Sequence, residues 1–168
     1  YNIVHPKSGT TRDWHKELIK DSSSYIYDTP GVLINDINKK NIINFTFNKI
    51  IEKKINIFLY VVDYLNGYNE IDHYAITKLR EYNKDIILIV NKFDNFTKIS
   101  NNDFSKYRIN KLSYISCSHN YGIDKLKSII QISKLDKLKI QKFDFSISIL
   151  GKPNVGKRTF LNTVLGYE

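Results

Sequence analysis

Residues 145–166 place an apolar segment, a loop with two glycines and an amphipathic segment directly after one another. The apolar run 147–150 predicts a buried strand, and apolar residues at helical spacing over 160–165 predict a helix. Between them, Gly151 and Gly156 bracket four residues before Lys157. Glycines let backbone N–H groups close around phosphates, while a lysine and a helix N-terminus supply positive charge. The segment therefore predicts a phosphate-binding loop (P-loop); the alternative is a glycine turn that merely joins a strand to a helix.

One position departs from the P-loop pattern GxxxxGK[ST]. The pattern has a hydroxyl after the lysine, which holds Mg²⁺. This chain has Arg158 there, and Thr159 follows one position later. An arginine pairs with phosphate but cannot ligate a metal. The sequence leaves open whether this loop binds Mg²⁺.

Length and composition fit one folded domain of ordinary size. The chain has 168 residues, of which 42% are hydrophobic, enough for a core. No apolar run approaches the roughly 20 residues of a membrane span, and the single cysteine fits a reducing compartment, so we expect a cytoplasmic protein. The formal charge of +9 suggests contact with a polyanion. The alternative is that lysine is simply abundant throughout.

The order of elements predicts a doubly wound α/β sheet, because strands and helices alternate along most of the chain. The near-continuous apolar runs are typical of parallel strands covered on both faces. Strands are expected over 14–19, 24–27, 55–63, 86–90, 112–115 and 147–150. Helices are expected over 36–54, 71–79, 103–109, 123–132 and 160–165.

Two polar motifs stand near the first strands. Thr11 lies on a loop, and a threonine on a mobile loop can close onto Mg²⁺ and a γ-phosphate. Asp28 ends a strand and can hold Mg²⁺ through water, and Gly31 lets its N–H approach a γ-phosphate. Alone, each motif is also an ordinary loop or turn sequence.

A third motif follows the strand at 86–90. Asp94 can accept two hydrogen bonds from the N1–H and amino group of guanine, a donor pair that adenine lacks. Asn91 can brace neighbouring loops, and Lys92 can pack its stem along the base. Small residues, Ser116 and Cys117, follow the next strand and let the backbone approach a flat base. The alternative is a polar turn after a strand.

Taken together and in this order, the motifs at 10–13, 28–31, 91–94 and 116–118 resemble the switch and guanine motifs of translation-factor-type GTPases. The resemblance is strongest to the bacterial Der (EngA) family, which carries two GTPase domains in tandem before a KH-like domain. The sequence GKPNVGK at 151–157 is similar to the P-loop that opens either domain of that family. The resemblance covers essentially the whole chain.

The resemblance implies a three-layer P-loop NTPase fold and hydrolysis of GTP to GDP and phosphate. It implies metal contacts at Thr11 and Asp28, a γ-phosphate contact at Gly31, and a potassium contact at Asn154. It implies maturation of the large ribosomal subunit as the role and its RNA as the partner. It assigns the nucleotide contacts to Asn91, Lys92, Asp94, Ser116, Cys117, Asn154, Gly156, Lys157 and Thr159. The alternative is a catalytically disabled nucleotide-binding or RNA-contacting module, because of Arg158.

By the same resemblance, residues 1–133 are a GTPase domain without its own P-loop strand and first helix, 134–144 are a linker, and 145–168 begin a second domain. The chain is then either an incomplete tandem protein or a permuted domain. An empty central position would expose apolar strand edges, and the linker spans up to about 35 Å when extended. We therefore hypothesise that residues 146–150 pair into the centre of the sheet and bring Lys157 towards Asp28.

Overall fold

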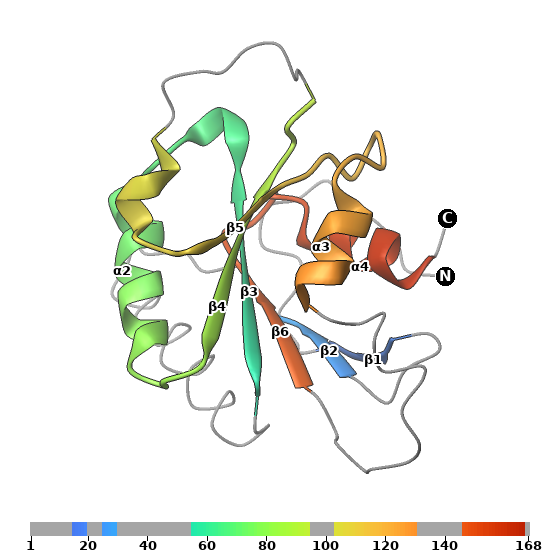
Figure 1. Ribbon diagram of the computed structural model, residues 1–168, viewed down its shortest axis with the longest axis horizontal. Coiled ribbons are helices and arrows are strands. Elements are labelled where there is room, and N and C mark those ends of the chain that lie inside the picture. Colours follow the sequence, from blue (N-terminus) through green and yellow to red (C-terminus); the bar gives the residue numbers. More distant parts are fainter. Residues whose placement is uncertain (1–14, 20–24, 30–54, 95–102, 131–145, 167–168) are drawn as a thin grey trace.

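The computed structural model describes residues 15–19, 25–29, 55–94, 103–130 and 146–166. These residues build one six-stranded sheet in the order β1-β2-β6-β3-β4-β5 (Figure 1). The strands are β1 His15–Leu18, β2 Tyr25–Asp28, β3 Ile57–Asp63, β4 Asp85–Asn91, β5 Lys111–Tyr114 and β6 Ser146–Leu150. The helices are α2 Glu70–Arg80, α3 Ile123–Ile130 and α4 Lys157–Leu165, with 3-10 turns η1 Tyr64–Asn66 and η2 Phe104–Tyr107. Among the strands of the described residues, only β1 runs antiparallel to its neighbour, so the expected mostly parallel α/β sheet is confirmed.

The strand latest in the sequence, β6, lies in the middle of the sheet. It pairs in parallel with β2 on one side and β3 on the other, and Ile149 stands opposite both Asp28 and Leu59. The hydroxyl of Thr29 donates to the carbonyl of Ile149 at 2.7 Å, just beyond β2. Ile147 and Ile149 have no exposed surface, which gives the insertion its hydrophobic driving force. Residues 146–150 thus lie where we hypothesised; the division of the chain into parts of two domains stays a prediction.

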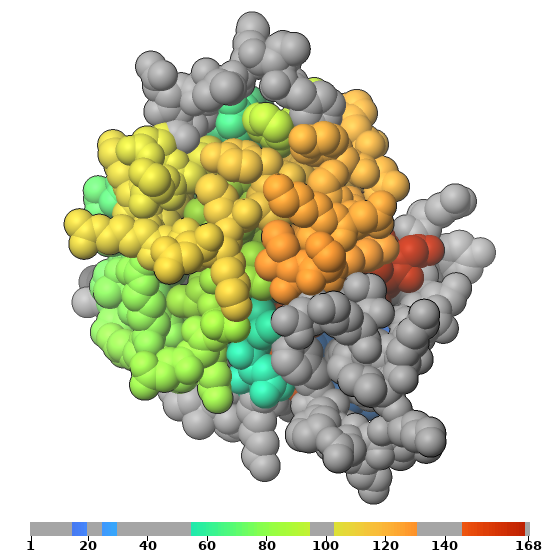
Figure 2. Space-filling view, in the orientation of Figure 1, coloured from blue at the N-terminus to red at the C-terminus, as the bar shows by residue number. Residues whose placement is uncertain are grey.

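Helices cover both faces of the sheet. Side chains alternate along each strand, so that Leu59 and Val61 of β3 face one layer while Phe58 and Tyr60 face the other. The first layer contains α3 and α4, and the second contains α2 and η2 (Figure 1). Figure 2 shows residues 103–130, yellow to orange, spread over the front of the molecule beside the green residues. This three-layer arrangement is that of a P-loop NTPase fold.

One expected helix is shorter and tighter than the pattern suggested. The segment 103–109 forms only the 3-10 turn η2, because Asp103 caps its start and Arg108 ends it with a left-handed conformation (φ 52°). The helix expected over 36–54 and the linker 134–144 lie outside the described residues. Within the described ranges, none of the helices has the length and apolar character that a bilayer crossing requires.

Candidate functional site

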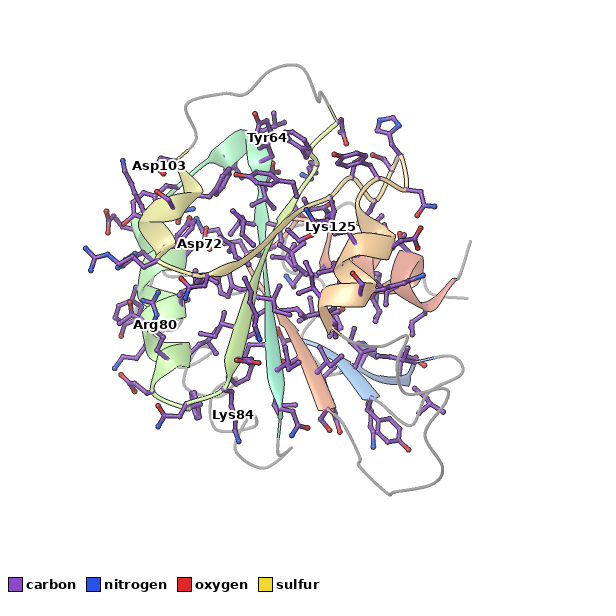
Figure 3. All side chains as sticks on the ribbon, in the orientation of Figure 1. Tyr64, Asp72, Arg80, Lys84, Asp103 and Lys125 are labelled. Carbon is purple, nitrogen blue, oxygen red and sulfur yellow. The ribbon has the colours of Figure 1, made fainter. Side chains whose placement is uncertain are left out.

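The five parallel strands bring their carboxyl ends to one edge of the sheet, which we call the rim. The rim segments begin after Asp28 of β2, Leu150 of β6, Asp63 of β3, Asn91 of β4 and Tyr114 of β5. Figure 3 labels Tyr64, the first residue after β3, at this edge. In parallel α/β sheets, ligands bind at the carboxyl ends of the strands. The fold therefore gathers at one rim those predicted motifs that lie in the described residues.

The P-loop wraps around the ammonium group of Lys157. Its Nζ donates to the carbonyl of Gly151 at 2.9 Å and to that of Lys152 at 2.8 Å, and the residue is 8% exposed. Burial lowers the pKa of Lys157 to about 8, against the opposing effect of the Asp28 and Asp72 charges. Helix α4 starts here without a side-chain cap, so its first N–H groups face the loop without a side-chain acceptor. The arrangement suits an incoming phosphate, which offers both sets of donors an acceptor.

Both P-loop glycines are required by close neighbours. A Cβ at Gly151 would stand 2.1 Å from the carbonyl oxygen of Val61. A Cβ at Gly156, which has φ +86°, would stand 2.3 Å from Nδ2 of Asn91. The P-loop can therefore lie directly against β3 and the end of β4 only because these positions lack side chains.

Asn91 joins the P-loop to the segment after β5. Its Nδ2 donates to the carbonyl of Val155 at 3.0 Å, and its Oδ1 accepts from the N–H of Cys117 at 3.3 Å. The Asn91 side chain is buried, and water is excluded from its contact with Val155 and partly excluded from its contact with Cys117. The bracing that we expected of Asn91 is therefore present in the geometry, and it links the phosphate end of the rim to the end predicted to hold a base.

Asp94 is oriented by two serines. The hydroxyls of Ser116 and Ser118 both donate to Oδ1 of Asp94, the latter at 3.3 Å. Ser116 is fully buried, whereas Asp94 is exposed and available to a ligand. Lys92 adopts φ 62° and pairs its Nζ with Oδ2 of Asp63 at 2.7 Å. The acceptor predicted to read guanine thus stands on a braced loop.

Asp28 is a buried carboxylate on the same rim. It is 1% exposed, and its Oδ1 has no hydrogen-bond partner among the described residues. Burial raises the pKa of Asp28, while the positive charges of Lys157, Arg158 and His15 act to lower it. The charges of Lys157 and Asp28 thus each act on the pKa of the other group. The described residues contain no group of three or more acidic, histidine or cysteine side chains that could hold a metal ion.

The remaining predicted positions differ in their surroundings. Asn154 is exposed on the P-loop with φ 64°, and Thr159 is exposed on α4. Cys117 is partly buried, and burial raises the pKa of its thiol to about 11. Thr11 and Gly31 lie outside the described residues. The structure thus brings together the predicted residues at 28, 91–94, 116–117 and 154–159.

Sequence reasoning missed two features of the rim. Asp63 ends a strand just as Asp28 and Asn91 do, and that shared position was a usable signal for its contact with Lys92. The second is the contact between Lys152 and Asn69 at the start of α2. These residues are 83 positions apart, so no local pattern predicts the contact.

Comparison with known proteins places the chain among GTPases. Residues 1–92 match the family described as 50S ribosome-binding GTPase. The chain is 32% identical over 177 residues to GTPase Der of Malacoplasma penetrans, covering 99% of this chain and 38% of that protein. It spans about two fifths of the length of such curated relatives.

Two solved structures share the fold at 20% sequence identity. Aquifex aeolicus Era, as a variant bound to GDP.AlF4-, gives a TM-score of 0.61 over 84% of this chain and 50% of that chain. An Era complex with MgGDPNP and a segment of 16S ribosomal RNA gives 0.60 with the same coverage. Since the family match spans more than half of the sequence, the chain belongs to the 50S ribosome-binding GTPase family.

Proposed function

We propose that this chain binds guanine nucleotide along the rim and hydrolyses GTP to GDP and phosphate. The observation that carries the proposal is the double contact of Asn91, which holds the P-loop and the 116–118 segment at the same site. A nucleotide needs both ends at once, because its phosphates and its base are covalently joined. The fold and the family match support the same function.

The phosphates are assigned to the P-loop. Lys157 supplies the cation, Gly156 permits close approach of the backbone, and the first turn of α4 adds N–H donors, with Thr159 beside them. Asn154, on the exposed side of the loop, is the residue that would hold a potassium ion by resemblance. Catalysis in this scheme comes from positioning and charge stabilisation rather than from a covalent nucleophile.

The base is assigned to the loops after β4 and β5. Asp94 accepts from guanine, and Ser116 fixes its carboxylate. The backbone at Cys117 and the stem of Lys92 flank the base in this proposal. With adenine in place of guanine, this carboxylate would lack both hydrogen bonds. Guanine should therefore bind at least about a hundredfold more tightly than adenine.

Magnesium fits one described side chain of the site and not another. The buried, unpartnered oxygen of Asp28 suits a water-mediated cation, and Thr11 and Gly31 would complete the γ-phosphate end by resemblance. Arg158 offers no oxygen where the P-loop pattern places one. Magnesium, when bound, neutralises charge on the terminal phosphates.

Arg158 also favours a second candidate function. Without a metal-ligating hydroxyl at this position, the rim can serve as a nucleotide-binding module that does not hydrolyse GTP. By resemblance, the chain contacts the large ribosomal subunit and its RNA with either function, and the formal charge of +9 suits an RNA partner. A cytoplasmic location is also part of the proposal, because the single cysteine suits a reducing compartment. We keep the assignment of 1–133, 134–144 and 145–168 to a first domain, a linker and the start of a second as part of this proposal.

The test is calorimetric binding of GDP, GTP and ADP to the whole chain, with and without Mg²⁺. We expect GDP to bind at least about a hundredfold more tightly than ADP; equal affinities would rule out the guanine assignment. Phosphate release from GTP then separates the two candidates. Release by the unmodified chain supports the enzyme, whereas release only by Arg158→Ser supports the disabled module, with Arg158→Lys as the matched control that restores no hydroxyl.

A further inference from the structure

The P-loop is tied to the start of α2 by a largely buried cation. The Nζ of Lys152 donates to Oδ1 of Asn69 at 2.6 Å and lies 3.4 Å from Oδ2 of Asp72. The Lys152 side chain is 22% exposed and that of Asp72 only 4%. Because so little water reaches this pair, it is screened less than an ion pair on the surface.

The acceptors of this cation are themselves held from several sides. The hydroxyl of the fully buried Tyr60, on β3, donates to Oδ1 of Asp72 at 2.8 Å. Asn69 caps α2 by accepting from the N–H of Asp72 at 3.0 Å, and its own N–H donates to the hydroxyl of Tyr107 at 3.0 Å. Figure 3 shows Asp72 between α2 and the sheet. Contacts from β3, α2 and η2 therefore hold Asn69 and Asp72, the two acceptors of Lys152, in place.

The anchored residue is also the one that holds the phosphate-binding lysine. The side chain of Lys152 donates a hydrogen bond to Asn69 at the start of α2, and its carbonyl accepts one from Nζ of Lys157 at 2.8 Å. Gly151, the other carbonyl around Lys157, has no side chain with which to anchor the loop. Lys152 thus joins the two parts: its side chain is held by the polar cluster at the start of α2, and its backbone belongs to the loop that surrounds Lys157.

We propose that Lys152 and Asp72 are positioning residues, which preorganise the P-loop for phosphate through the contact with Asn69. This inference rests on the proposed binding of nucleotide at the rim. A loop that is already ordered loses less conformational freedom when a ligand binds, so affinity rises without a new ligand contact. Releasing the side chain of Lys152 should leave the sheet intact and loosen the loop.

The test compares Lys152→Met, which keeps the apolar stem, with Lys152→Arg, which keeps the charge. The matched control is Lys111→Met. Lys111 forms an exposed ion pair with Asp85, and both residues lie at the amino ends of their strands, away from the rim. Two quantities are measured: affinity for GDP, and amide hydrogen exchange of the peptide covering 151–157 without nucleotide. Asp72→Asn gives a second test from the other side of the pair.

We expect Lys152→Met to weaken GDP binding about tenfold and to speed exchange of the 151–157 amides, with a similar effect for Asp72→Asn. Lys152→Arg should stay within about threefold of the unmodified chain, and Lys111→Met should change neither quantity. Unchanged affinity and exchange in Lys152→Met would overturn the inference, as would an Arg variant as weak as the Met variant. If the unmodified chain does not bind GDP, the proposed function fails, and the exchange measurement still decides whether Lys152 orders the loop.

Discussion

Gly156 and Gly166 stand at the two ends of α4, and replacing each with alanine isolates the contact between the P-loop and Asn91. Both glycines have positive φ, +86° and +75°. An alanine at either position therefore pays a similar backbone strain of about 1 kcal/mol. A Cβ at Gly166 would meet nothing within 4 Å, whereas a Cβ at Gly156 would meet Nδ2 of Asn91 at 2.3 Å. The difference between the two variants thus reports on Asn91.

The size of the difference follows from the contact that is lost. Displacing Asn91 breaks its hydrogen bond to the carbonyl of Val155 and leaves buried polar atoms unsatisfied, at about 2 kcal/mol. We expect Gly166→Ala to lower the free energy of unfolding by about 1 kcal/mol and Gly156→Ala by about 3 kcal/mol. With a urea m-value of about 2 kcal/mol/M, the two unfolding midpoints should differ by about 1 M.

The assay is urea unfolding followed by circular dichroism, repeated in an Asn91→Ala background. Without the Asn91 amide the extra loss at Gly156 should disappear, because the two changes act on one contact. Equal midpoints for Gly156→Ala and Gly166→Ala in the otherwise unmodified chain would show that Asn91 does not hold the P-loop. A difference that persists in Asn91→Ala would show that something else does.

Three further outcomes are expected. Affinity for GDP should fall as pH rises through about 8, because phosphate requires the charged form of Lys157 and so raises its lowered pKa. Calorimetry in two buffers should then find that GDP binding takes up about half a proton at pH 8. An affinity for GDP that does not change between pH 7 and pH 9 would contradict this. The thiol of Cys117 should react with a disulfide reagent about tenfold more slowly than a free thiol at pH 7, because burial raises its pKa to about 11 and the smaller thiolate fraction outweighs the higher nucleophilicity of that thiolate; reaction at the rate of glutathione would be inconsistent with the burial. Ile149→Ala should cost about 3 kcal/mol of unfolding free energy, against about 0.5 kcal/mol or less for Leu18→Ala on the exposed edge, and equal small effects would place β6 outside the sheet.

Local patterns predicted most of the elements. The runs at 55–63 and 86–90 form β3 and β4 because their continuous apolar character suits strands buried on both faces. The helix after the P-loop begins at Lys157, where glycine and lysine mark its start. The pattern was less informative over 103–109, where a capping aspartate and a left-handed Arg108 limit the helix to one turn. Local spacing cannot weigh such competing end signals.

The sequence by itself determined which motifs the chain carries, in which order they come, and that those at 28–31, 91–94 and 116–118 each follow a predicted strand. It also determined the departure at Arg158, since the residue type at one position of a motif is read directly from the sequence. The sequence offered the central place of residues 146–150 only as a hypothesis, and the tertiary structure decided it: β6 lies between β2 and β3, where the hydroxyl of Thr29 meets a carbonyl 120 positions away. The contacts of Asn91 with Val155 and of Lys152 with Asn69 were decided in the same way. Pairings over such separations depend on how whole layers pack, and packing in three dimensions leaves no period in the sequence to read.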